Sequence, residues 1–126
     1  MGVFERRIRV AGSTQTIWRE LDAIIDTGSD HCQIPRDVTD AIGAQLAFRT
    51  TVLLATNREV AVEVVNIALQ FDEYLIHTTA YVGTAGGPTL IGSLALGQLG
   101  LGVDPAGERL VHRVFHLLNL TRRPAA

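Results

Sequence analysis

A buried apolar run that ends in an acidic turn constrains this chain more than any other feature. Ala23, Ile24 and Ile25 are consecutive apolar residues, typical of a short core strand, and Asp26 follows them directly. Burying a charge costs several kcal/mol unless hydrogen bonds satisfy it. The turn at 26–29, Asp-Thr-Gly-Ser, can supply such bonds, and its glycine allows a tight turn. The sequence therefore predicts a carboxylate held at the end of a buried strand.

The same four residues also fit an ordinary strand-end turn with a local side-chain hydrogen bond. Asp-Thr-Gly arises by chance in roughly a few per cent of chains of this length. A second segment favours a functional site. At 89–96 another apolar strand pattern runs into Gly92, and a short helical pattern follows.

Together, the two segments resemble the retropepsin-like aspartic proteases, a single-lobe family with retroviral and bacterial members. The match covers about residues 20–112, with the parts in the same order. In that family a hydrophobic-hydrophobic-Asp-Thr/Ser-Gly loop carries the catalytic aspartate, and a later hydrophobic-hydrophobic-Gly segment packs beneath it. The resemblance implies this set: catalytic Asp26; loop-supporting Thr27, Gly28 and Ser29; and a second motif of Leu90, Ile91 and Gly92.

Frequent turn signals between β-rich runs predict an all-β fold. We expect a small, curved, barrel-like lobe of roughly six to nine strands with one or two short helices. One helix is expected at 35–42, ended by Gly43, and another after Ser93 as its N-cap. Residues 1–126 are interpreted as one domain, with a core at about 3–112 and a C-terminal arm at 113–126. Residues 30–34 are expected to be extended. The expected strands are 3–10, 14–21, 23–25, 49–55, 60–71, 74–82, 89–91, 101–103 and 108–112.

A β-hairpin is predicted where the strands at 49–55 and 60–71 meet, because the polar segment between them includes Asn57, which tolerates a left-handed turn. The apolar phase changes at Val64–Val65, which predicts a bulge or bend there. By resemblance the hairpin is the flap that closes over substrate, although an ordinary surface hairpin fits the residues equally well. The predicted substrate-binding residues are Asp30, Thr56, Asn57 and Arg58.

Composition narrows the function classes. A net charge of −2 and only 6% aromatic residues argue against a nucleic-acid surface, and no apolar run reaches membrane-spanning length. The lone Cys32 cannot form an intrachain disulfide and reads as a small buried hydrophobe, with a redox-sensing role left open. We expect a cytoplasmic protein without a cofactor. His112 and His116 lack nearby further ligands for a metal.

Peptide hydrolysis without a metal or a covalent nucleophile needs an activated water and a nearby acid, which two carboxylates sharing a proton provide. Only Asp26 lies in the required context, because Asp22 is too far along the same strand and Asp30 follows the turn. The second carboxylate must then come from another chain. By resemblance, the chain is an aspartic endopeptidase acting on peptides as a homodimer, in which Thr27 bonds across the axis.

Two departures from the retroviral pattern leave an alternative open. Ser93 and Leu94 follow Gly92 where an arginine would brace the dimer, and the hairpin tip lacks glycine. The alternative is a catalytically inactive dimerisation or peptide-binding module on the same fold. A further alternative is an unrelated small β protein with a chance motif. Ser29 replaces a common alanine, and its hydroxyl group is expected to stabilise the ionised carboxylate.

Overall fold

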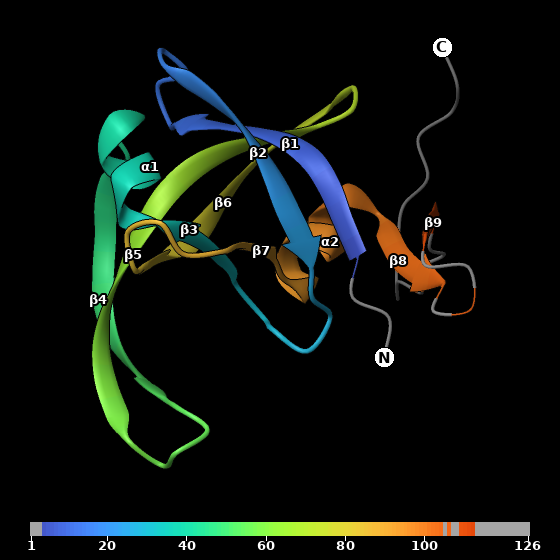
Figure 1. Cartoon of the computed structure of the whole chain (residues 1–126). Helices are drawn as coiled ribbons and strands as arrows, with labels where there is room; N and C mark the ends of the chain where they lie inside the picture. Colours follow the sequence, from blue (N-terminus) through green and yellow to red (C-terminus); the bar gives the residue numbers. More distant parts are fainter. Residues whose placement is uncertain (1–3, 105, 107–108, 113–126) are drawn as a thin grey trace, which may run out of the picture.

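The computed structural model describes residues 4–104, 106 and 109–112, and this part of the chain is built mainly of strands (Figure 1). It confirms the predicted all-β fold class. Its strands and helices, in chain order, are β1 Phe4–Gly12, β2 Trp18–Ile25, β3 Cys32–Pro35, α1 Arg36–Ala41, β4 Gln45–Leu53, β5 Glu59–Phe71, β6 Tyr74–Gly83, β7 Thr89–Ile91, α2 Ser93–Leu99, β8 Leu101–Asp104 and β9 Arg109–His112.

Six of the strands close into a barrel. They are hydrogen-bonded in the order β1-β2-β7-β3-β6-β5, and the last residues of β1 return to pair with β5, with Val10 opposite Leu69. β4 is attached outside this ring, to β5 alone. Closure hides the backbone edges that an open sheet would expose. The largest fully buried side chains of the core are Ile8, Val10, Ile25, Cys32, Ile34, Val64, Ile67, Leu69 and Ile91.

The strand that leads to Asp26 is longer than the sequence indicated. Separate segments at 14–21 and 23–25 were expected, but β2 is one strand, and residues 13–17 form the connection before it. β2 pairs with β1 along its whole length, from Ala11 opposite Trp18 to Phe4 opposite Ile25. The continuous pairing provides hydrogen-bond partners for the backbone N–H and C=O groups of β2, including those of its polar residues. The polar side chains interrupt the apolar pattern, which is why the sequence did not indicate one long strand.

The predicted β-hairpin is confirmed as β4–β5. Asn57 has the left-handed φ of 61° that its turn requires, and the N–H of Leu54 donates to the carbonyl of Arg58 at 2.9 Å. β4 begins at Gln45, four residues earlier than expected. The irregularity expected in β5 lies on its partner strand, where the pairing shifts between Leu46 and Phe48 opposite Val64–Val65. Both valines are buried, in agreement with the phase change.

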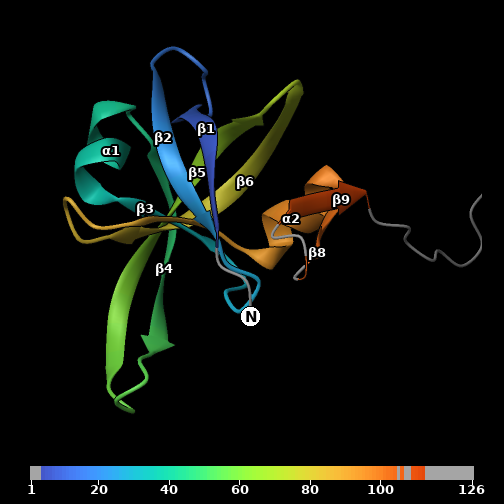
Figure 2. The same cartoon turned by 45° about the vertical axis from the view of Figure 1, so that its right-hand side comes forward.

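The hairpin projects from the barrel because β5 has two different halves. Val64 to Phe71 pair with β6, whereas residues 59–63 pair only with β4. Figures 1 and 2 show this outer half standing clear of the other strands, on the same side of the molecule as the loop between β2 and β3. The position of the hairpin therefore depends on contacts near the point where it leaves the barrel.

Each of the two short helices is followed by a glycine with a left-handed backbone conformation. α1 follows Pro35 and ends before Gly43, whose φ is +68°, as predicted. Ser93 was expected as the N-cap of α2, but the N-cap is Gly92 and no side chain caps the helix. The helix ends at Gly100, which has a left-handed φ of 72°. No helix in the described ranges is long and apolar enough to cross a membrane.

The last hairpin forms as expected, with β8 antiparallel to β9 and Leu101 opposite His112. The C-terminal arm expected at 113–126 lies outside the described residues. His116 lies in the same undescribed segment.

The start of α2 crosses directly beneath the turn that follows Asp26. The N–H groups of Ser93 and Leu94 donate to the carbonyls of Ser29 and Asp30, at 2.8 and 3.0 Å. Gly92 comes just before these two residues, at the point where the two backbones are closest. A Cβ atom on Gly92 would stand 2.6–2.7 Å from the carbonyl oxygens of residues 29–31. Its φ of −94° suits any residue, so close backbone approach alone requires glycine.

We predict that Gly92→Ala destabilises the protein by about 1–3 kcal/mol or more, because a rigid backbone must move to admit the methyl group. Gly97→Ala is the matched control. Gly97 lies inside the same helix with open space around it, and alanine there should stabilise the fold by about 0.8–1 kcal/mol. Urea unfolding of both variants measures the difference. Equal stabilities would contradict the crossing as a tight contact.

Candidate active site

Asp26 follows β2 directly and is half-buried. Its backbone N–H donates to the carbonyl of Ile91 at 2.9 Å, which ties it to β7. Its Oδ1 atom accepts a hydrogen bond of 3.0 Å from the N–H of Gly28. The other carboxylate oxygen has no protein donor in the described structure and can accept from a bound molecule. The site residue is thus fixed by two strands and still accessible.

Ser29 braces the loop rather than the carboxylate. Its hydroxyl group donates to the backbone carbonyl of His31 at 2.9 Å, so the expectation that it stabilises the ionised Asp26 was wrong for this structure. The physical reason is the crossing by α2. The carbonyl of Ser29 accepts from Ser93, which holds the turn in a shape that directs the hydroxyl group toward His31.

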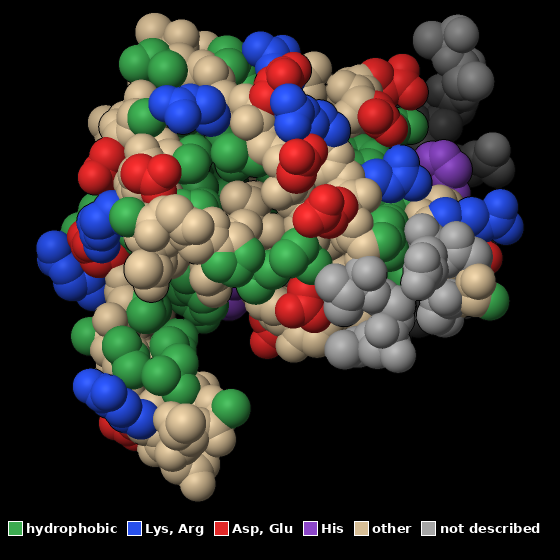
Figure 3. Space-filling model, in the orientation of Figure 1, with side chains coloured by type: hydrophobic (Ala, Val, Ile, Leu, Met, Phe, Trp, Pro, Cys, Tyr) green, Lys and Arg blue, Asp and Glu red, His purple; other side chains and the backbone are tan. Residues whose placement is uncertain are grey.

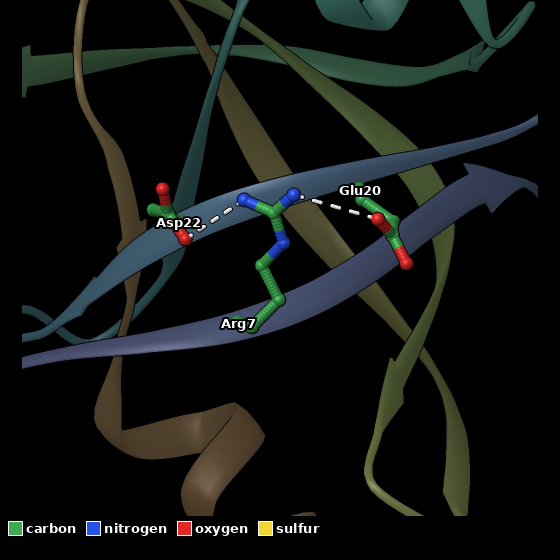
Figure 4. Close-up of polar contacts among 3 residues, drawn as sticks. All are labelled: Arg7, Glu20 and Asp22. Carbon is green, nitrogen blue, oxygen red and sulfur yellow. Dashed lines mark hydrogen bonds and ion pairs between the residues drawn. The ribbon is translucent and has the colours of Figure 1, made fainter.

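The remaining loop residues face solvent. Thr27 and Asp30 are exposed, and the described structure gives Thr27 no hydrogen-bond partner, so its role across a dimer axis stays a prediction. Asp22 takes no part in the site. Figure 4 shows Arg7 between Asp22 and Glu20, at 3.0 and 3.4 Å, on the outer face of β1 and β2.

A groove of about 790 Å³ separates the projecting hairpin from the barrel. Figure 3 shows this side of the molecule hollowed between the hairpin and the rest of the lobe, with hydrophobic side chains on the hairpin. Ser29 brings the Asp26 loop to the groove. The other walls come from the hairpin strands, from Gln33 and Arg36, from residues 81–83 at the end of β6, and from Thr84 just after it.

The predicted flap residues mark the hairpin tip, not the groove. Thr56, Asn57 and Arg58 are exposed and lie outside the groove lining. The stem lines it instead, and the sequence did hint at this, because valines 60 and 62 alternate toward one face. Gln33 and Tyr81 had no such signal. They meet through the parallel pairing of β3 with β6, which no local pattern reveals.

Three charged residues form the polar end of the groove. Glu63 accepts from Arg36 at 2.5 Å and lies 3.7 Å from Arg49. The pKa of Glu63 is lowered below its ordinary value, mainly by the hydrogen bond from Arg36 and then by the charge of Arg36. The charge of Arg49 makes a smaller contribution in the same direction. The same contact raises the pKa of Arg36. This end of the groove therefore keeps its charges over a wide range of pH.

Cys32 and His31 have structural surroundings. Cys32 is buried, as expected, and burial raises the pKa of its thiol, partly offset by the N–H of Gly92. A raised thiol pKa disfavours the reactive thiolate. The imidazole of His31 packs on Tyr81 with ring centroids 4.7 Å apart. Within the ranges described, no group of three or more His, Cys, Asp or Glu side chains could hold a metal ion.

Comparison with known proteins gives matches through structure only. No protein-family model matches the sequence, and no curated protein matches it. Among solved structures, the EIAV protease in complex with the inhibitor HBY-793 has a TM-score of 0.57 and 16% identity, over 77% of this chain and 88% of that one. A retropepsin-like aspartic protease from Rickettsia conorii has a TM-score of 0.55 and 16% identity, over 81% and 87% of the two chains.

A third solved structure, a protein of unknown function from Legionella pneumophila, has a TM-score of 0.50 and 18% identity, over 79% of this chain and 90% of that one. Identities this low bear on the fold and not on activity. The likeness to the two named proteases extends over about four fifths of this chain. The chain has the retropepsin-like fold that its two sequence motifs indicated.

Proposed function

We propose that this protein is an aspartic endopeptidase that works as a homodimer. The observation that carries the proposal is the half-buried Asp26, fixed by Gly28 and β7 yet accessible, on a loop that borders a groove. The likeness of the fold to that of two proteases supports it.

The proposed reaction uses two Asp26 carboxylates that share one proton. One accepts a proton from water, which then attacks the peptide carbonyl, and the other donates its proton to the carbonyl oxygen. The reaction needs no cofactor. In the described part of the chain no hydrogen bond joins Asp26 to a second carboxyl group, and Asp22 is engaged by Arg7. A second chain, related by a two-fold axis at the exposed Thr27–Gly28 turn, would complete the pair.

The groove suits an extended peptide. Its hairpin wall carries apolar side chains, including Val52, Val60 and Val62. Residues 59–63 of β5 pair with β4 alone, so their other edge can accept an added strand. Backbone pairing of this kind binds peptides through their main chain, while side-chain pockets select among them. A peptide or protein substrate is therefore the class of ligand we propose.

A peptide-binding module without turnover is the second candidate. The resemblance leads one to expect an arginine after Gly92, but the structure has Ser93 and then Leu94, which is 53% exposed. The hairpin tip also has Asn57 as its left-handed residue instead of glycine. Both candidates use the same groove, and only hydrolysis separates them.

We predict that Asp26→Asn abolishes cleavage of a proteome-derived peptide library, by at least about 100-fold, because the general base is lost. The variant should fold, since an amide oxygen can still accept from Gly28. Asp22→Asn is the matched control. It weakens a solvent-exposed ion pair, which contributes little to stability, and should keep full activity. Mass spectrometry of the library reads the result. Undiminished cleavage by Asp26→Asn would refute the proposal.

Activity should belong to the dimer. Specific activity is expected to fall on dilution, since one Asp26 per chain cannot form the pair. In an equal mixture of native and Asp26→Asn chains with random pairing, roughly a quarter of the dimers keep both aspartates. Activity per native chain should then fall to about half. A strictly linear dependence on the native fraction, without loss on dilution, would show that each chain works alone.

The rate should fall at alkaline pH, because the mechanism needs one proton shared between two carboxylates and both are then ionised. Activity is expected in the acidic to near-neutral range. A pH profile of kcat/KM for a cleaved library peptide tests this. A rate that continued to rise into the alkaline range would be incompatible with the shared proton.

A further inference from the structure

The hairpin leaves the barrel at one defined point. In chain order, Val64 is the first residue of β5 that pairs with β6, where it lies opposite Tyr81. Glu63, one residue earlier, belongs to the outer half of β5, which pairs with β4 alone. A two-stranded ribbon has little stability of its own in water. Its angle to the barrel must therefore be set by the few contacts at its base.

The closest polar contact at that base joins the hairpin to helix α1. Arg36, the first residue of α1, donates through Nη2 to Oε1 of Glu63 at 2.5 Å. Arg49, opposite Glu63 on β4, approaches its other oxygen, Oε2, at 3.7 Å. One carboxylate thus links the helix of the lobe to both strands of the hairpin.

We propose that the Arg36–Glu63 ion pair positions the hairpin over the groove. Both residues line the groove, so the angle that their contact sets also determines the width of the groove. Neither residue contacts Asp26 in the structure, and they are positioning residues rather than catalytic ones. Loss of the pair should leave the barrel folded and let the hairpin sample more positions.

The anchor is suited to acidic conditions. The charged groups around Glu63 are Arg36 and Arg49, and Asp40 on α1 acts on Arg36. The hydrogen bond and charge of Arg36 lower the pKa of Glu63. A lowered carboxyl pKa means that the contact contributes above the unfolded-state pKa and is lost only as pH falls through the folded-state value. The pair therefore persists into the acidic range.

Distances across the molecule test the proposal without any assay of activity. Spin labels at Thr56→Cys and Glu73→Cys, both exposed positions, lie at opposite ends of β5, while the buried Cys32 stays unlabelled. Excess unlabelled chain restricts the measurement to distances within one chain. Exposed ion pairs shift equilibria by about two- to fivefold. Arg36→Gln and Glu63→Gln should each raise the ratio of displaced to anchored hairpins about two- to fivefold. The distance distribution should broaden accordingly.

The double variant should broaden the distribution no further than either single variant, because the two changes remove one contact. Arg7→Gln is the control, since it breaks a more exposed ion pair on the far strands β1 and β2 and should leave the distance distribution unchanged (Figure 4). Unchanged distributions in both single variants, or additive broadening in the double variant, would overturn the proposal.

An activity measurement links the anchor to the proposed function and can fail separately from it. KM for a cleaved peptide should rise about two- to fivefold in either single variant, with a smaller change in kcat, because the groove holds substrate less well. Cleavage that depends on Asp26, together with unchanged distances, would refute the anchor and leave the protease proposal standing. If no peptide is cleaved, the protease proposal fails, and the distances still decide the role of the anchor.

Discussion

The crossing of two backbones at Gly92 is the contact on which the site depends. Three carbonyl oxygens of the loop at 29–31 surround this position so closely that a single added carbon has no room. The N–H groups of Ser93 and Leu94 bond to that same loop. One segment thereby fixes the turn after Asp26 and begins a helix. The carboxylate of Asp26 is held by the main-chain N–H of Gly28 in this turn.

Closure of the barrel and freedom of the hairpin come from the same strand. The inner half of β5 is paired on both edges and contributes Ile67 and Leu69 to the core. Its outer half is paired on one edge and lines the groove. The Arg36–Glu63 contact lies at the junction between them. One continuous strand, β5, therefore forms part of the closed barrel and one wall of the groove, with the charged side chains of Arg36 and Glu63 where the two halves meet.

Features governed by local chemistry could be predicted from the sequence. The left-handed turn at Asn57 and the stop of α1 at Gly43 follow from the conformations that these residues tolerate. Features that depend on contact with a distant segment of the chain could not be predicted in this way. The bulge fell on β4 instead of β5, because either strand of a pair can accommodate the extra residue. Ser29 bonds to His31 rather than Asp26 because a distant segment fixes its loop.

The sequence by itself determined the all-β class, the position of Asp26 at the end of a core strand and the pairing of its motif with a second one at Gly92. The first two follow from apolar periodicity and from residue types that suit few conformations, and the third from the resemblance to the retropepsin-like proteases. Only the tertiary structure decided which residues line the groove and that Arg36 meets Glu63. Those contacts join segments far apart in the chain, and the parallel pairing and barrel closure that create them leave no local trace.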